Sequence, residues 1–152
     1  MAYTVEHPPF AVTADAVVLT LRDEKLCALV ITRGRAPFAG RLALPGGFVD
    51  IDESVDHAVR RELAEETGLE LKPRQLEQLG AYGAPDRDPR MRTVSVAYLA
   101  LLPEISDVKA GDDASDVQCL PVSWLLARRD RLAFDHRLIL RDGADLARHR
   151  LG

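Results

Sequence analysis

The sequence predicts an α/β fold in which a mixed β-sheet carries helices on its faces. Two runs of apolar and β-branched residues precede one amphipathic helix, and further runs follow it before two helical patterns near the end of the chain. At 152 residues, with 47% hydrophobic and 29% charged residues, the chain has the size and composition of one globular domain. We therefore expect a single domain over residues 1–152.

The first half of the chain predicts a β-hairpin and a loop. Strands are expected at residues 10–21 and 26–32, because both runs are rich in β-branched and apolar side chains and a polar turn separates them. Residues 34–40 contain glycine and proline, which indicates a loop. A short strand from Leu42 should break at Pro45-Gly46-Gly47.

A helix is expected over residues 53–67. Apolar side chains recur there at helical spacing, and Gly68 supplies a stop signal. Further strands are expected at residues 76–82, 94–102 and 117–122, a short helix from residue 123 and a terminal helix at 134–151. Gly143 is unfavourable inside that last helix.

Charge and targeting signals narrow the class of partner. The net charge of −4 disfavours a broad surface for nucleic acid or an anionic membrane, so a small molecule is the expected ligand. We expect no signal peptide and no membrane span, because no basic-then-apolar leader and no run of 18 apolar residues occur. Cys27 and Cys119 lie in apolar runs, which predicts reduced core thiols and a cytoplasmic protein.

Residues 47–69, called here the central segment, carry the strongest chemical signal. On a helix, positions three and four apart share a face, so Glu62, Glu65 and Glu66 should project close together. An oxygen-only cluster of this kind suits a hard divalent cation such as Mg²⁺, or alternatively Mn²⁺. We therefore predict a metal site. Glu65 and Glu66 are also catalytic candidates.

Arg61, Glu53 and the glycines at the start of the central segment are expected to have supporting roles. Arg61 has Glu53 behind it on the chain and Glu65 four residues ahead, so it can tie the loop to the helix. The turn at Gly46 and Gly47 has little side-chain bulk, which lets a carbonyl reach a metal ion and a phosphate approach closely.

The spacing of the central segment is too specific for chance. At average usage of about 6% per residue type, seven fixed identities occur at a given start with probability on the order of 10⁻⁹ to 10⁻⁸. The pattern resembles the Nudix box at every fixed position. The resemblance implies a Nudix α/β/α sandwich and Mg²⁺-dependent hydrolysis of a nucleoside diphosphate linked to another moiety. It also implies metal ligation by Glu62, Glu65, Glu66 and the Gly46 carbonyl, with Arg61 and Glu53 as a structural pair.

Residues outside the central segment favour one substrate. Pro85 lies sixteen residues after Leu69, a feature of the ADP-ribose pyrophosphatase group of this family. The segments LPGGFVD, PDRDPRMRTVSVAYLAL and FDH also resemble the Nudix domain of NrtR-type regulators. The chain stops at Gly152, which leaves no room for their DNA-binding domain, so we expect an enzyme. The SQPWPFPxS motif of NADH-cleaving relatives is absent.

Candidate substrate-binding residues follow from their chemistry. Arg87, Arg90 and Arg92 could clamp a phosphate by bidentate hydrogen bonds, or could form a solvated loop balanced by neighbouring aspartates. Four aromatic side chains are candidates for stacking on adenine, although each is more often a core residue: Phe38, Phe48, Tyr82 and Trp124.

The general base is less clearly marked in the sequence. Asp112, Asp113 and Asp116 occupy a loop that carries such a residue in resembling enzymes, and we select Asp113. The alternative interpretation is that these aspartates only make the loop soluble. His57 is expected at the surface, and His7, His136 and His149 in the core or at the surface, because none has a companion at ligand spacing.

Two other functions stay open. The same reaction class includes pyrophosphohydrolases of modified (d)NTPs, and a different class comprises non-catalytic modules that sense ADP-ribose. Intact glutamates in the central segment favour the enzyme. By resemblance, a homodimer is also expected, with residues 3–10 as an exchanged arm.

Overall fold

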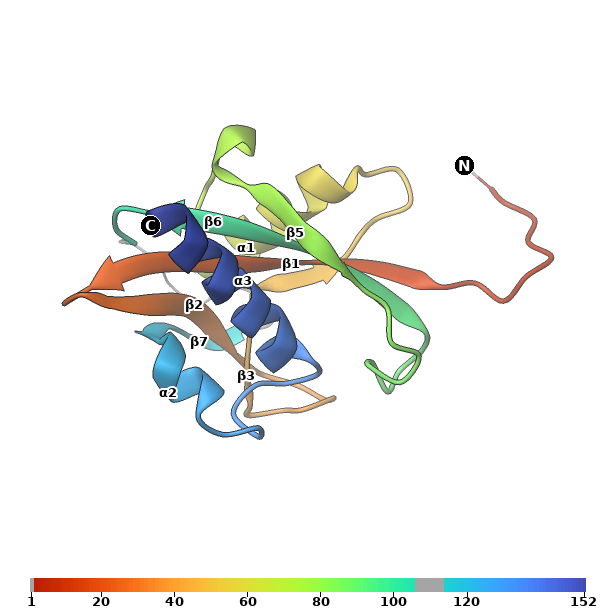
Figure 1. The fold of residues 1–152 in the computed structure, drawn as a ribbon. Coiled ribbons are helices and arrows are strands. Elements are labelled where there is room, and N and C mark those ends of the chain that lie inside the picture. The colour runs from red at the N-terminus through yellow and green to blue at the C-terminus, as the bar shows by residue number, and fades with distance from the viewer. Residues whose placement is uncertain (1, 106–113) are drawn as a thin grey trace.

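The computed structural model describes residues 2–105 and 114–152, and the sheet in this part of the chain confirms the α/β fold with a mixed sheet. Five strands lie in the order β3-β2-β1-β6-β5, while β4 pairs with β1 and β7 pairs with β2 (Figure 1). The strands are β1 (Ala11–Arg22), β2 (Lys25–Arg33), β3 (Leu42–Ala43), β4 (Gly46–Phe48), β5 (Glu77–Tyr82), β6 (Thr93–Leu102) and β7 (Ala114–Pro121). The helices are α1 (Val55–Thr67), a 3₁₀ turn η1 (Pro73–Gln75), α2 (Val122–Leu126) and α3 (His136–Leu151).

The long strand β1 is the centre of the sheet. It pairs in parallel with β6 from Ala11 to Thr20, but pairs with β2 only from Leu19 to Arg22. Beyond that point β1 and β2 diverge. The short strands fill the wedge between them, because β4 pairs with residues 13–15 of β1 and β3 pairs with Ile31 and Thr32 of β2.

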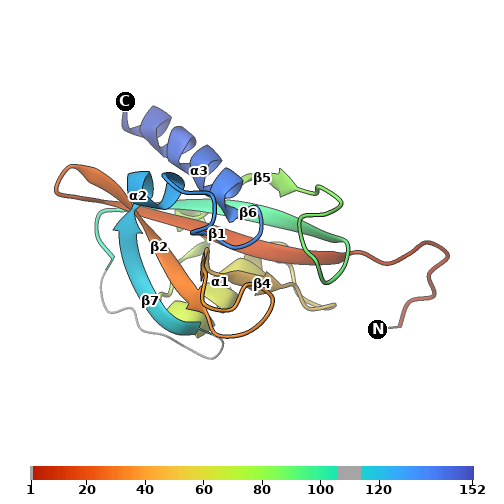
Figure 2. The ribbon, with the colours of Figure 1, turned by 90° about the horizontal axis from the view of Figure 1, so that it is seen from below.

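Helices cover both faces of the sheet (Figure 2). Successive residues of β1 point to opposite faces. Ala14, Ala16 and Val18 pack with Ala58, Val59 and Leu63 of α1. Val17 and Leu19 pack on the other face with Val122 and Leu125 of α2 and with Ile139 and Leu140 of α3. The result is an α/β/α sandwich with two apolar layers.

Capping residues fix the ends of α1. The Ser54 side chain accepts a hydrogen bond from the His57 N–H at 3.1 Å, and Gly68 ends the helix at a left-handed φ of 78°. The expected helix at residues 53–67 is therefore confirmed, with its first turn beginning two residues later.

Close packing explains the glycine inside α3, which runs unbroken from His136 to Leu151. A Cβ atom at Gly143 would lie 2.8 Å from Val17 Cγ1. The helix crosses β1 so closely at this point that a side chain has no room. Tertiary packing therefore outweighs the low helix propensity of glycine.

Two expectations need adjustment. The predicted break at Pro45-Gly46-Gly47 lies instead at Leu44 and Pro45, because Gly46 and Gly47 already belong to β4 and pair with β1. Of the two cysteines, Cys27 is buried, whereas Cys119 is only partly buried. None of the helices in the described part of the chain has both the length and the apolar character needed to span a membrane.

Candidate active site

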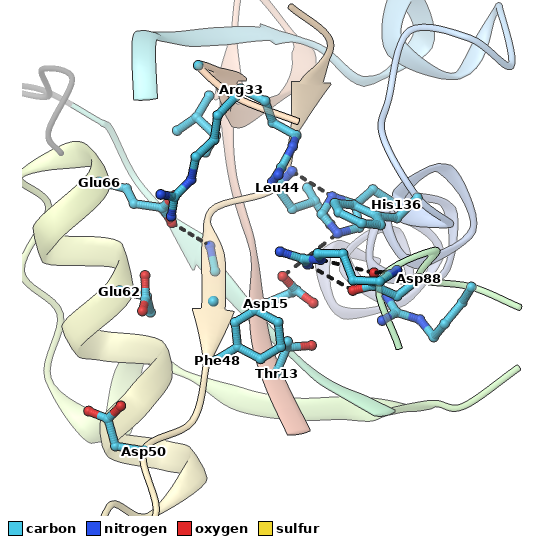
Figure 3. A pocket seen from close by; sticks show the side chains of 18 residues that line it. Thr13, Asp15, Arg33, Leu44, Phe48, Asp50, Glu62, Glu66, Asp88 and His136 are labelled. Carbon is cyan, nitrogen blue, oxygen red and sulfur yellow. Dashed lines mark hydrogen bonds and ion pairs between the residues drawn. The ribbon is translucent and has the colours of Figure 1, made fainter. Parts of the chain in front are cut away.

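A pocket of about 240 Å³ opens in the wedge between β1 and β2 (Figure 3). Because the short strand β4 stands in this wedge, residues from both faces of the sheet reach the pocket. Glu62 and Glu66 come from α1 on one side, and His136 comes from α3 on the other. The expected phosphate turn, Gly46 and Gly47, lies between them.

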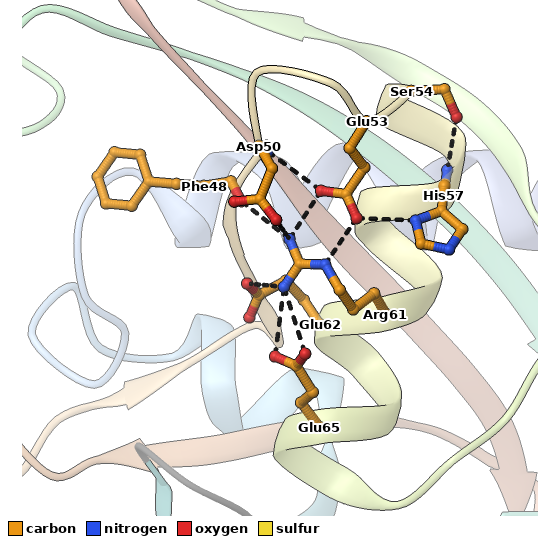
Figure 4. Close-up of polar contacts among 8 residues, drawn as sticks. All are labelled: Phe48, Asp50, Glu53, Ser54, His57, Arg61, Glu62 and Glu65. Atoms are coloured by element: carbon orange, nitrogen blue, oxygen red, sulfur yellow. Dashed lines mark hydrogen bonds and ion pairs between the residues drawn. The ribbon is translucent and has the colours of Figure 1, made fainter.

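Arg61 ties the loop of the central segment to its helix (Figure 4). Its guanidinium donates from Nε to Glu53 Oε2 at 2.6 Å and from Nη2 to Glu53 Oε1 at 2.8 Å. Nη2 also donates to the Phe48 carbonyl at 3.2 Å. The hydrogen bonds from Arg61 lower the pKa of Glu53 to about 2. The structure thus brings together the two residues expected to act as a pair.

The three glutamates expected to bind metal do not converge in the structure. Arg61 Nη1 lies 2.8 Å from Glu62 Oε1 and 3.3 Å from Glu65 Oε2, so one cation holds both carboxylates. Glu66 instead accepts the Gly46 N–H at Oε1, at 2.7 Å. Over residues 2–105 and 114–152, no three His, Cys, Asp or Glu side chains are grouped closely enough to hold a metal ion. Arg61 thus holds Glu62 and Glu65 together, while the Gly46 N–H holds Glu66 separately from them.

The two glycines of β4 each leave room for a carboxyl group. A Cβ atom at Gly47 would lie 2.5 Å from the Glu62 carboxyl carbon, and one at Gly46 would lie 2.3 Å from Asp15 Oδ1. Carboxyl groups therefore lie against both faces of β4. Burial raises the pKa of Glu62, and the hydrogen bond from Arg61 partly opposes this effect.

Arg90 is the only one of the three candidate phosphate-binding arginines that lines the pocket without being buried. Asp88 fixes it through two hydrogen bonds, at 3.1 Å from Nε and 2.8 Å from Nη2. Its guanidinium lies 4.8 Å from the centre of the Phe48 ring and 5.5 Å from that of Phe134. Burial alone would raise the pKa of Asp88, but the hydrogen bonds from Arg90 outweigh it and lower that pKa.

The other two arginines have different surroundings from those expected. Arg87 lines the pocket, but its side chain is 3% exposed and donates two hydrogen bonds to Asp135, at 3.0 and 2.7 Å. Two of the N–H groups that Arg87 would offer to a phosphate are therefore bonded to Asp135. Arg92 donates to the Gly83 carbonyl at 3.2 Å and stacks on Phe10, away from the pocket.

Among the aromatic candidates, Phe48 alone lines the pocket. Phe38 packs edge-on against Phe134 with ring centres 4.9 Å apart. Tyr82 donates to Asp142 at 2.8 Å, and Trp124 lies under Arg131. Tyr82 and Trp124 therefore have structural partners outside the pocket, whereas Phe38 packs against Phe134, which lines it.

The acidic loop is only partly described. Asp113, the expected general base, and Asp112 lie outside the described residues. Asp116 is exposed on β7, opposite Thr32. His57 contacts Glu53 at 2.7 Å, and its side chain is 59% exposed, as expected for a surface residue.

Several residues of the pocket were not singled out for binding from the sequence, among them Asp15, Arg33, Phe134 and His136. The sequence signal for two of them was the FDH triplet at residues 134–136, which the resemblance already included. In the structure Phe134 has a left-handed φ of 53° and lies against Arg90. Asp135 accepts hydrogen bonds from Arg87, and His136 accepts one from the Leu44 N–H. Burial lowers the pKa of Arg33, and neighbouring Arg90 adds to this effect.

Known proteins resemble this chain in sequence and in fold. A NUDIX domain model matches residues 10–143. An ADP-ribose pyrophosphatase of Methanocaldococcus jannaschii is 43% identical over 137 residues, which cover 90% of this chain and 73% of that protein.

Two of the similar solved structures bear on the pocket. The NUDIX domain of Shewanella oneidensis NrtR, complexed with ADP ribose, is 36% identical with a TM-score of 0.82, and the match covers 96% of this chain and 91% of that one. A bifunctional NMN adenylyltransferase/ADP ribose pyrophosphatase from Francisella tularensis, complexed with AMP and a Mn ion, is 33% identical with a TM-score of 0.75. That match covers 89% of this chain but only 41% of the Francisella protein.

Proposed function

The chain belongs to the Nudix family, and from this premise we propose that it hydrolyses the diphosphate bond of ADP-ribose, giving AMP and ribose 5-phosphate. The observation that carries the proposal is the composition of the pocket. The carboxylates of α1 and the glycines of β4 face the same space as Arg33 and Arg90, which suit an anionic diphosphate. The names of the Methanocaldococcus and Francisella relatives support the choice of substrate.

For this reaction we propose Mg²⁺, with Mn²⁺ as a substitute. The donor atoms suit such a cation by their chemistry, and the glutamate side chains would surround it after leaving the partners that they have in this structure. Glu62, Glu65, Glu66 and the Gly46 carbonyl are hard oxygen donors, and the absence of a side chain at Gly47 lets the Glu62 carboxyl lie against β4. A cation held there supplies a bound water of lowered pKa and offsets charge on the diphosphate. The Mn ion in the Francisella structure supports a divalent cation.

The protein's own residues hold the reactants in place. Arg61 and Glu53 fix the loop that leads into α1, and Arg61 balances the charges of Glu62 and Glu65. Arg90, fixed by Asp88, is the candidate partner for a phosphate oxygen. We keep Glu65, Glu66 and Asp113 as the candidates that orient or deprotonate the attacking water.

A substrate panel with identification of products tests this function. The purified chain is incubated with Mg²⁺ and with ADP-ribose, NADH or 8-oxo-dGTP, and the products are separated by ion-exchange chromatography. We expect AMP from ADP-ribose at the highest kcat/KM. Pyrophosphate release from 8-oxo-dGTP as the preferred reaction would replace ADP-ribose by the (d)NTP alternative.

The same panel addresses the sensing alternative. The NrtR domain with bound ADP ribose is the reason to keep it. Tight binding of ADP-ribose by calorimetry, with turnover at background in both Mg²⁺ and Mn²⁺, would identify a non-catalytic module. Turnover that depends on Glu66 would exclude it.

We further propose a homodimer in the cytoplasm, formed through residues 3–10. In this segment Tyr3, Val5 and Phe10 are 62%, 63% and 52% exposed, which makes an apolar contact with a second copy favourable. Light scattering of the full chain tests the dimer, and a chain shortened by residues 2–9 provides the comparison. A monomer at micromolar concentration contradicts this part of the proposal.

A further inference from the structure

Asp15 and His136 form a buried polar pair that the hydrolysis step does not use. Both line the pocket, at 5% and 4% exposed, on the side of β4 opposite to the glutamates of α1 (Figure 3). Asp15 comes from β1 and His136 from the first turn of α3. Buried polar groups are costly unless a partner satisfies them. His136 Nε2 and Asp15 Oδ1 are 3.8 Å apart, too far to satisfy each other by a hydrogen bond, so a ligand group is a suitable partner for both.

The hydrogen bonds of His136 define the role of its outer nitrogen. Nδ1 accepts the Leu44 N–H at 3.0 Å, so this nitrogen carries no proton. Burial lowers the pKa of His136, which favours the neutral ring. Because Nδ1 accepts a hydrogen bond, the proton of the neutral ring lies on Nε2. Nε2–H is therefore a hydrogen-bond donor, and it lies 3.8 Å from Asp15 Oδ1.

The neighbouring carboxyl group supplies the acceptor. Asp15 Oδ2 accepts a hydrogen bond from Ser95 Oγ, which leaves Oδ1 facing His136. Position 46 has room only for glycine, since a Cβ there would lie 2.3 Å from both Asp15 Oδ1 and the Ala14 carbonyl oxygen. The site is therefore built from four separate segments of the chain.

A donor and an acceptor 3.8 Å apart are too distant for a direct hydrogen bond, but one oxygen atom to the side of the line that joins them can be within hydrogen-bond distance of both. A hydroxyl oxygen accepts from Nε2–H and donates to Oδ1 at the same time, whereas an amino group only donates and a carbonyl only accepts. Thr13, two residues before Asp15 on the same face of β1, has a buried hydroxyl with no partner among the described residues. A second polar group of the ligand would satisfy it.

We propose that Asp15 and His136 bind a ribose hydroxyl of the substrate and so select ribose-bearing ligands over their deoxy analogues. This inference rests on the proposed function, because it assumes a nucleoside diphosphate sugar in the pocket. Either ribose of ADP-ribose could supply the hydroxyl. A hydrogen bond to a charged group contributes about 1.5–3 kcal/mol, which corresponds to roughly a 10- to 100-fold change in affinity.

Calorimetry tests the proposal without depending on hydrolysis. Binding is measured in a Glu66→Gln background, with ADP-ribose and with two analogues that lack a hydroxyl on the adenosine ribose or on the terminal ribose. We expect one analogue to bind roughly 10- to 100-fold more weakly, and its identity assigns the ribose. After Asp15→Asn is added, that ratio should fall below about threefold.

Two outcomes would overturn the proposal. If both analogues bind as tightly as ADP-ribose in the Glu66→Gln background, the pair holds only water. If Asp15→Asn weakens all ligands equally and leaves the ratio unchanged, the pair is structural. His136→Gln, which keeps an acceptor for the Leu44 N–H, gives a second measurement of the ratio if Asp15→Asn does not fold.

Tyr82→Phe is the matched control, because it removes a partly buried hydroxyl that does not line the pocket and should leave the ratio intact. An intact ratio in a protein that does not hydrolyse ADP-ribose would refute the proposed function alone.

Discussion

Replacing Arg61 by alanine should destabilise the fold as well as the active site. Arg61 donates two hydrogen bonds to Glu53 and one each to Glu62 and the Phe48 carbonyl. The Glu53 side chain is only 7% exposed. Arg61→Ala therefore leaves a nearly buried carboxylate without its main partner.

The size of the effect follows from this burial. Removing one member of a buried ion pair costs about 3–5 kcal/mol, and we take about 3 kcal/mol because the Arg61 side chain is 23% exposed. A domain of this length loses about 2–4 °C of Tm per kcal/mol. The expected decrease in Tm is thus roughly 6–12 °C at neutral pH.

The effect depends on pH in a defined direction. The pKa of Glu53 is lowered from 4.5 to about 2 in the folded protein. A lowered pKa contributes stability that is present above the unfolded pKa and is lost as pH falls through the folded pKa. The difference in stability between wild type and Arg61→Ala should therefore shrink as pH falls from 4.5 to 2.

A double-mutant cycle measures the interaction directly. Urea unfolding of wild type, Arg61→Ala, Glu53→Gln and the double variant gives the coupling free energy. We expect Glu53→Gln to cost much less in the Arg61→Ala background than in wild type. Equal costs in both backgrounds, or a loss below about 1 kcal/mol for Arg61→Ala, would refute the reasoning.

Three further outcomes follow from the structure. Gly47→Ala places a Cβ atom 2.5 Å from the Glu62 carboxyl, so kcat on ADP-ribose should fall by at least about tenfold; unchanged kcat would contradict the role of this close approach. Gly143→Ala places a Cβ atom 2.8 Å from Val17 and should cost about 1–3 kcal/mol in urea unfolding, whereas a gain in stability would show that α3 shifts freely. EDTA should abolish hydrolysis, and both Mg²⁺ and Mn²⁺ should restore it; activity that survives EDTA excludes a metal-dependent reaction.

Much of the fold could be predicted because its signals are local. The hairpin of β1 and β2 and the helix α1 each follow from the periodicity of neighbouring residues. The sequence did not show why a glycine occurs inside α3, because Gly143 is explained by its close packing against Val17, a residue 126 positions earlier in the chain. Strand β4 was not expected to include Gly46 and Gly47, because its pairing with β1 comes from the wedge between two longer strands.

In the candidate site, too, the residues that share one helix could be predicted, whereas contacts between distant segments could not. Glu62, Glu65 and Glu66 lie on one helix, so their spacing alone indicated a common function. Asp15 and His136 meet only because β4 and α3 bring distant segments to β1, and no local pattern indicates that contact. Arg87 was expected to bind phosphate, but Asp135 occupies its fork through a contact that the sequence does not reveal.

The most direct test of the central claim is turnover of ADP-ribose by wild type and by Glu66→Gln, measured together with binding. Glu66 lines the pocket and is held by the Gly46 N–H, and glutamine keeps its shape while removing its charge. With Mg²⁺ we expect AMP release by wild type and a loss of at least about 100-fold in kcat for Glu66→Gln, with ADP-ribose still bound. Equal turnover by the two proteins would contradict the assignment of this pocket as the hydrolytic site.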